Sequence, residues 1–132
     1  MPKVAGSIEG LQALQQANAH NLAALRPDGA LGRAVLYATT AVQRYAMAIT
    51  HVDTGSWRAS HRMDYRTAMG SPRGEVFVDP GAVNPRSGAK PVDYATKWEQ
   101  RGGEMAVYQR TINEQGDKIG QDAVNLVKGG LA

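Results

Sequence analysis

Residues 30–50, ALGRAVLYATTAVQRYAMAIT, carry the most regular hydrophobic pattern in the chain. Their apolar side chains recur at alternating spacings of four and three residues, at Leu31, Val35, Ala38, Val42, Tyr45 and Ile49. This spacing predicts an amphipathic helix. Small residues smooth much of its remaining surface, at Gly32, Ala34, Ala41 and Ala48. We therefore expect another helix to approach closely there, and we expect this helix to lie across the face of a sheet.

The period changes after this helix. In residues 57–65, WRASHRMDY, mainly apolar or aromatic side chains at odd positions alternate with polar or charged side chains at even positions. This alternation is typical of a half-buried strand. The first few of these residues also fit a helical turn. Residues 70–74, GSPRG, predict a turn, and residues 75–79, EVFVD, predict a second strand. Together these segments predict a β-hairpin.

Helices are expected on both sides of this unit. A first helix after Ser7 carries a narrow leucine stripe and is ended by Pro27 and Gly29. Residues 80–91, PGAVNPRSGAKP, contain three prolines and two glycines and predict a loop that is mobile unless a partner orders it. Pro91 opens a short helix that ends at Gly102, and a last helix covers residues 104–128.

The order of elements predicts an α+β fold, in which long amphipathic helices pack on a small antiparallel β-sheet built around a hairpin. A chain of 132 residues is one domain's worth. We expect a single domain over residues 1–132, with an N-terminal helical arm at 1–29 and a core at 30–128. Alanine and glycine supply much of the apolar content, so the core of a monomer is thin and a partner subunit would supplement it.

The composition excludes some classes of protein. There is no cysteine, which rules out disulfides and thiolate metal sites. No run approaches the ~20 apolar residues of a membrane span, and the first residues lack the apolar segment of a signal peptide. We expect a protein that is made and used in a cytoplasm, or inside something assembled there, and that has no membrane partner. The net charge of +3 permits contact with nucleic acid but does not require it.

Residues that could perform chemistry are few. The one metal-like group is His51, Asp53 and His61, which would have to meet between a helix end and a strand. The simpler interpretation is that Asp53 caps a turn and that His61 packs on the same strand face as Tyr65. No nucleophile elbow or phosphate-binding loop is present. We expect no enzymatic activity, no cofactor and no metal.

Arg58, Arg62 and Arg66 fall on one face whether their segment is a strand or a helix. Three interpretations are open: a solvated strand face, a contact with a neighbouring subunit, or a row that faces DNA phosphates. Asp64 lies within the row, which favours salt bridges to a subunit over contact with phosphate.

Trp98 follows Tyr94 by four residues, so the two rings should stack on one face of the short helix. At least one ring should pack in the core, and the other is a candidate interface anchor. Our candidate subunit interface therefore comprises Arg58, Arg62, Arg66, Trp98 and Glu99.

Two stretches carry a resemblance to a known family. Residues 52–60, VDTGSWRAS, resemble the Val-Asp-Thr-Gly-x-Leu-Arg-x-Ser signature of tailed-phage neck and tail-completion proteins, also described as head–tail joining or minor tail proteins. Residues 94–102, YATKWEQRG, match the Tyr-Ala-x-x-x-Glu-x-x-Gly stretch of that family. Asp53, Thr54 and Gly55 would form a structural turn. Gly55 would adopt the backbone conformation that the turn requires, and Asp53 would cap the turn. The chain departs from the family at Trp57, where an aliphatic residue is usual, and in lacking a Pro-Phe pair before the last helix.

The resemblance covers residues 30–128 and implies a structural role in the virion. Six or twelve copies would form a ring at the head–tail junction around the DNA channel, next to other connector, neck or tail proteins, after assembly in the host cytoplasm. The arginine row, the 80–91 loop and the small-residue side of the second helix are candidate contact faces. Alternatives are a tail terminator, a head–tail connector ring, a small basic nucleic-acid-binding module, and a metal-dependent hydrolase that uses His51, Asp53 and His61.

Overall fold

The computed structural model describes residues 4–52 and 55–132, with side chains from residue 10 onward, and its fold is α+β as predicted. The elements are, in chain order, α1 (Val4–Ala24), α2 (Ala30–Ile49), α3 (Ser56–Ala59), β1 (His61–Ala68), β2 (Ser71–Val78), α4 (Pro91–Arg101), the 3-10 turn η1 (Gly103–Met105) and α5 (Val107–Gly129).

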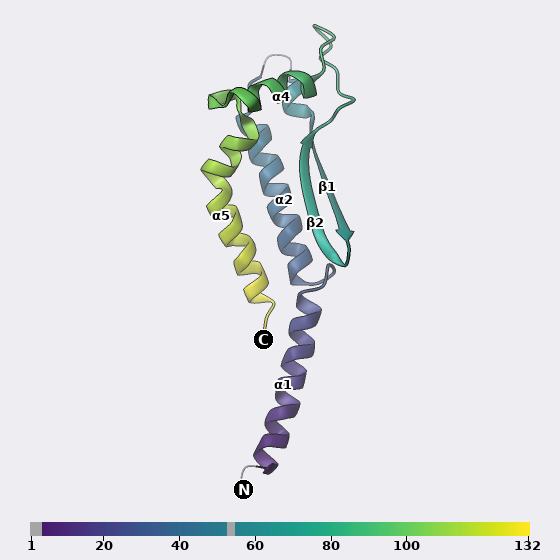
Figure 1. Ribbon diagram of the computed structural model, residues 1–132, viewed down its shortest axis with the longest axis vertical. Coiled ribbons are helices and arrows are strands. Elements are labelled where there is room, and N and C mark those ends of the chain that lie inside the picture. The colour runs from purple at the N-terminus through teal and green to yellow at the C-terminus, as the bar shows by residue number, and fades with distance from the viewer. Residues whose placement is uncertain (1–3, 53–54) are drawn as a thin grey trace.

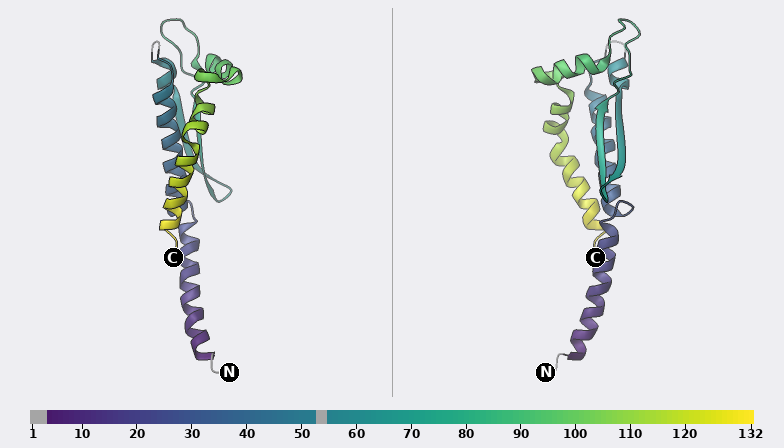
Figure 2. Two further views of the ribbon diagram at one scale, coloured as in Figure 1. Left: turned by 90° about the vertical axis from the view of Figure 1, so that its left-hand side faces the viewer. Right: turned by 45° about the vertical axis from the view of Figure 1, so that its right-hand side comes forward.

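Helix α2 is the centre of the molecule. The β1–β2 hairpin packs on one side of it and α5 runs along another, while α4 lies across one end (Figure 1). The prediction that this helix lies across a sheet is therefore confirmed. At the opposite end, α1 extends away from the body as an arm, and the chain's C-terminus lies near the base of that arm (Figure 2).

The predicted hairpin is present, but its limits differ from the prediction. The first strand begins at His61 rather than at Trp57, since residues 56–59 form the helical turn α3. The second strand begins at Ser71, so residues 71–74 belong to the strand and not to the turn. A two-residue turn at Met69 and Gly70, both with positive φ (52° and 80°), joins the strands and matches their right-handed twist.

A glycine inside β2 explains how closely the hairpin approaches α2. A Cβ at Gly74 would clash with the side chain of Thr39 on α2. The strand therefore needs glycine at its crossing point, although glycine is otherwise unfavourable within strands. This close contact explains why Gly74, a residue type that is common in turns, lies in the middle of a strand.

The most deeply buried residues of α2 are small ones: Ala30, Gly32, Ala34, Thr39 and Ala46. Ala46 joins Trp57, Val78, Ala95 and Val107 in the core cluster, where α2, the hairpin, α4 and α5 meet. The regular apolar stripe identified in the sequence is only half-buried along its length. Part of that stripe is thus left at the surface.

The remaining segments follow the sequence closely. Helix α1 begins at Val4, earlier than the predicted start after Ser7, and ends at Ala24, a little before the expected stop. Helix α5 begins three residues later than expected, after η1. Residues 80–90 have no helix or strand, but Asn84 organises them, because its backbone and side chain bond to Gly88, Ala89 and Arg86. Gly120 in α5 has open space around it, so it marks no close helix crossing. No described helix is both long and apolar enough to cross a membrane.

Candidate functional site

An open apolar groove of about 540 Å³ lies between α2, α5 and β2. We call it the α2–α5 groove. Its floor is formed by α2, including four of the six residues of the apolar stripe, with Val76 from β2 and Ile112, Val124 and Val127 from α5 on its walls. The α2 residues are Leu31, Ala34, Val35, Ala38, Thr39 and Val42.

The groove offers little for recognition of a polar ligand. Its two hydroxyl groups belong to Thr39 and Tyr108, and both are used within the protein. Thr39 Oγ1 donates to the Val35 carbonyl (2.7 Å), and the Tyr108 hydroxyl bonds to His61 (2.7 Å). Small-molecule sites combine apolar walls with a few convergent polar groups. An apolar groove without such groups suits the side chains of another protein segment.

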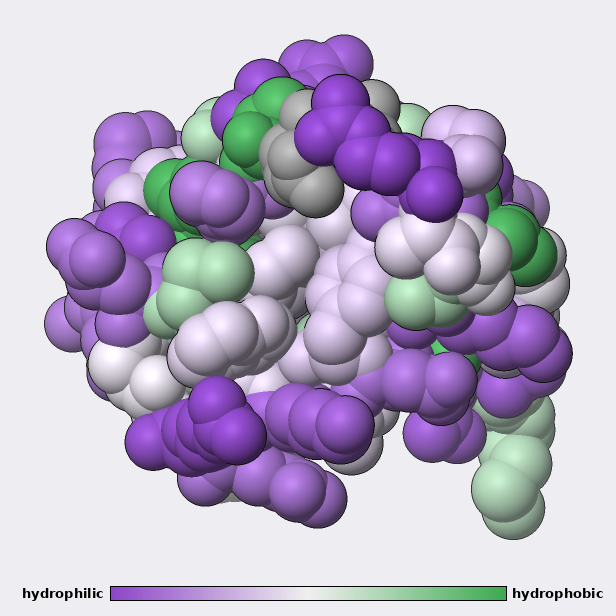
Figure 3. Space-filling view, turned by 90° about the horizontal axis from the view of Figure 1, so that it is seen from above, coloured by the Kyte–Doolittle hydropathy of each residue, from purple (hydrophilic) through white to green (hydrophobic). Residues whose placement is uncertain are grey.

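Large apolar residues are exposed in the groove and next to it. Ile112 on its wall is 61% exposed, and Leu126 nearby on α5 is 44% exposed. The end of the molecule that carries α4 is different: seen from above, hydrophobic residues form only separate small areas on a mostly hydrophilic surface (Figure 3). The described residues at this end therefore offer no apolar surface as continuous as the groove.

A chain of buried hydrogen bonds lies beside the groove and ties three elements together. Thr50 Oγ1 donates to the Ala46 carbonyl, so its oxygen accepts from His61 Nε2 (2.7 Å). His61 Nδ1 then accepts from the Tyr108 hydroxyl (2.7 Å). Burial lowers the pKa of His61 to about 4, and burial together with the nearby Glu99 charge raises the pKa of Tyr108 well above its usual value. Both groups are therefore neutral near pH 7.

This arrangement removes His61 from the suggested metal site. Both ring nitrogens are engaged, and the residue is 1% exposed. His51 is exposed on the surface, and Asp53 lies outside the described residues. Among the residues whose structure is described, no group of three His, Asp or Glu side chains is placed to hold a metal ion.

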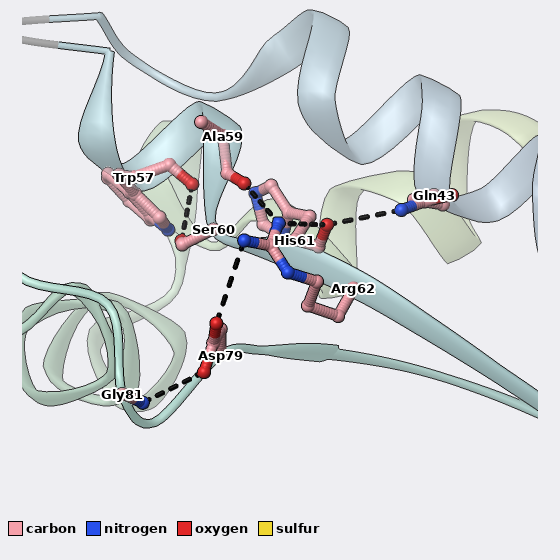
Figure 4. Close-up of polar contacts among 8 residues, drawn as sticks. All are labelled: Gln43, Trp57, Ala59, Ser60, His61, Arg62, Asp79 and Gly81. Atoms are coloured by element: carbon pink, nitrogen blue, oxygen red, sulfur yellow. Dashed lines mark hydrogen bonds and ion pairs between the residues drawn. The ribbon is translucent and has the colours of Figure 1, made fainter.

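The three arginines of the predicted row all have partners within the chain. Arg58 donates to the carbonyls of Ala48 and Thr50 at the end of α2 (3.5 and 3.2 Å). Arg62 donates to the Ala59 carbonyl and pairs with Asp79 (3.6 Å; Figure 4).

On the outer face of the hairpin the charges balance. Arg66 pairs with Asp64 (3.7 Å) and with Glu75 (3.6 Å), and Arg73 also pairs with Glu75 (3.2 Å). With Arg62 and Asp79, this face therefore holds three arginines and three carboxylates in pairs. Such a face lacks the uncompensated positive charge that a phosphate-binding row needs. Its role as a subunit contact stays a prediction.

Trp98 and Glu99 lie where α4 meets the body, and both have contacts within the chain. Trp98 packs against the core cluster, and its ring lies under the Arg101 guanidinium (5.1 Å). Tyr94 also packs on that cluster, with its ring edge-on to Trp57 (5.6 Å). The predicted core packing of these aromatic residues is thus present, with Trp57 as a ring partner of Tyr94 that the spacing did not reveal.

Glu99 has a role that the sequence analysis missed. Its carboxylate accepts the backbone N–H groups of Tyr108 (2.5 Å) and Gln109 (3.4 Å) in the first turn of α5. Ala106, the residue before that helix, has no side-chain oxygen to cap it. Glu99 therefore serves as a cap from another helix, an arrangement that no local motif signals. Its contact with a neighbouring subunit stays a prediction.

The predicted turn at Asp53, Thr54 and Gly55 lies partly outside the described residues, which exclude Asp53 and Thr54. Gly55 has φ +84° and directly precedes α3. After it, Trp57 is buried, and the Ser60 hydroxyl donates to the Trp57 carbonyl (2.6 Å; Figure 4). The backbone of Ser60 in turn accepts from Asp79 N–H (2.7 Å), which closes the open end of the hairpin.

Searches against protein-family models, curated proteins and solved structures each found no match to this chain.

Proposed function

We propose that this chain is a structural, non-enzymatic subunit of a tailed bacteriophage, a neck or tail-completion protein that forms a ring at the head–tail junction around the DNA channel. The observation that carries the proposal is the open α2–α5 groove. A subunit that leaves this much apolar surface unfilled is stabilised by burial against a neighbour. A ring of six or twelve copies supplies that neighbour through a heterologous interface.

The two motif stretches support the proposal because their residues have coherent structural roles. In residues 94–102, Ala95 is buried in the core, Glu99 caps α5, and Gly102 ends α4 with φ +75°. In residues 52–60, Gly55 turns the chain and Arg58 bonds to the end of α2. These are roles in holding a fold rather than in catalysis, as expected of a signature shared by structural proteins.

The position of the ring is the finer part of the proposal. A tail terminator and a head–tail connector ring use the same type of subunit contact, and adjacent connector, neck or tail proteins would then be its partners. The paired charges on the outer hairpin face support weak, non-specific proximity to packaged DNA over strong binding. They count against the more distant alternative, a free nucleic-acid-binding module.

Purified protein tests the proposal directly. We expect ring-shaped particles in negative-stain electron microscopy, a discrete oligomer in native mass spectrometry, and feeble DNA binding in a gel shift at two salt concentrations. A module that binds nucleic acid would instead bind tightly at low salt and lose affinity steeply at high salt. A monomer that turns over a substrate would refute the proposal.

The arginine row is tested separately by alanine replacements at Arg58, Arg62 and Arg66. Loss of ring assembly with a folded subunit supports their place in the interface. Normal assembly of the triple variant removes them from it while leaving the ring proposal intact.

A further inference from the structure

We propose that the α1 arm of one copy docks in the α2–α5 groove of the next copy, so that each subunit gives an arm and receives one. This inference rests on the proposed function, since it specifies how neighbouring subunits of the ring hold each other.

The arm carries an apolar face that no described part of its own subunit covers. Leu11, Leu14 and Leu22 are 53%, 56% and 63% exposed, and Leu25 directly after the helix is 46% exposed. At 100° per residue, the three helical leucines fall within a sector of about 80°. A single row of exposed leucines on an extended helix is a docking face of the helix-in-groove type.

The arm also lacks charge where it would be buried. Between Gly10 and Leu25 the sequence contains no Asp, Glu, Lys or Arg. A helix of this composition enters an apolar groove without the large desolvation cost of burying an unpaired charge. An exposed arm that served only to remain in solvent would not need such a sequence.

The lengths of the two surfaces agree. The leucine row from Leu11 to Leu25 spans about 21 Å at 1.5 Å per residue. The floor of the groove along α2, from Leu31 to Val42, spans about 17 Å, and its α5 wall from Tyr108 to Val127 spans about 29 Å on the same basis.

The arm cannot fill the groove of its own subunit, because its base is held in an outward direction. His20 Nε2 donates to the Gly130 carbonyl (2.8 Å), and Ala132 N–H donates to Asn21 Oδ1 (2.8 Å). Packing there is tight, since a Cβ at Gly130 would clash with Ala30 at the start of α2. From this base α1 runs away from the body (Figure 1). The groove that its leucines reach is therefore that of a second copy.

Two variants test the exchange, one on each surface. L11D/L14D places charges on the arm face, and I112D/V124D places charges in the groove at exposed positions, so both subunits should fold. We expect each variant alone to be monomeric, with self-association weakened at least a hundredfold, as expected when two apolar anchors of an interface are replaced by charged residues. A 1:1 mixture should form a heterodimer, because the groove variant keeps an intact arm and the arm variant keeps an intact groove.

A13D/Q16D is the matched control, since it adds the same charges to the opposite face of α1 and should assemble like the wild type. Sedimentation velocity measures the wild type, the three variants and the 1:1 mixture, and thermal unfolding by circular dichroism verifies that each variant is folded. Wild-type-like rings from both variants would overturn the arm exchange while leaving the ring proposal standing. A wild-type chain that stays monomeric at all concentrations would overturn the exchange as well.

Discussion

The Tyr108 hydroxyl donates a hydrogen bond to His61 Nδ1 (2.7 Å), with the two rings edge-on at 5.3 Å between centroids. This contact joins the first turn of α5 to the first residue of the hairpin, 47 residues earlier in the chain. It therefore fixes one end of the wall of the α2–α5 groove against the sheet.

Stability should decrease on acidification because of His61. Its pKa is about 4 in the folded protein and 6.5 in the unfolded chain, so the unfolded state binds more protons between these values. The free energy of unfolding should fall by roughly 2 kcal/mol as pH drops from 6.5 to 4, after allowance for screening, and level off below that range. Urea unfolding at a series of pH values measures the slope. His61→Leu should lose most of this slope, and an unchanged slope in that variant would contradict the assignment.

Removal of the Tyr108 hydroxyl should destabilise the protein through its partner. Tyr108→Phe leaves the buried His61 Nδ1 without a donor, which should cost about 1–2 kcal/mol. Tyr37→Phe is the matched control, since its hydroxyl bonds to Asp122 at an exposed site (2.9 Å) and water can replace it. Chemical denaturation should therefore separate the two variants. Equal losses of unfolding free energy in the two variants would mean that the buried Tyr108–His61 bond stabilises the protein no more than an exposed one.

The regular parts of the fold could be predicted because their signals are local. The stripe on α2 has a helical period, and the alternation of residues 61–65 placed His61 on the inward face with Met63 and Tyr65, where they are buried or half-buried. Such periods reflect which face of an element is covered. They do not tell which element covers it.

The parts that could not be predicted depend on contacts between distant segments. The start of β2 was misplaced because Gly74 is required by Thr39, on another element. The capping role of Glu99 depends on how the chain turns at Gly102 before α5 begins. The α2–α5 groove is likewise absent from any sequence pattern, because a half-buried stripe and a fully buried stripe have the same period.

Glu99 should stabilise α5 by capping it. Glu99→Ala removes the acceptor of the Tyr108 and Gln109 N–H groups and should cost about 1–2 kcal/mol. Glu104→Gln is the control, because it removes a negative charge near the same helix start without removing those bonds. Hydrogen exchange of the Tyr108 and Gln109 amides, measured by NMR, should accelerate in the first variant and not in the second. Similar amide exchange rates in both variants would mean that Glu99 acts through its negative charge alone and not through the two hydrogen bonds.

Gly74 should be the glycine that least tolerates a side chain in the hairpin. Gly74→Ala directs a methyl group into Thr39, so the hairpin has to move off α2 or the helix has to shift, and we expect a loss of about 2–3 kcal/mol. Gly120→Ala makes the same chemical change in open space within α5 and should stabilise the protein by up to about 1 kcal/mol through helix propensity. Thr39→Ala removes the Oγ1 and Cγ2 atoms from the clash and should partly rescue Gly74→Ala. Thermal unfolding of the two single variants and the double variant measures this coupling. Additive effects of Gly74→Ala and Thr39→Ala would show that the two residues do not meet, and the account of how the hairpin is seated on α2 would fail.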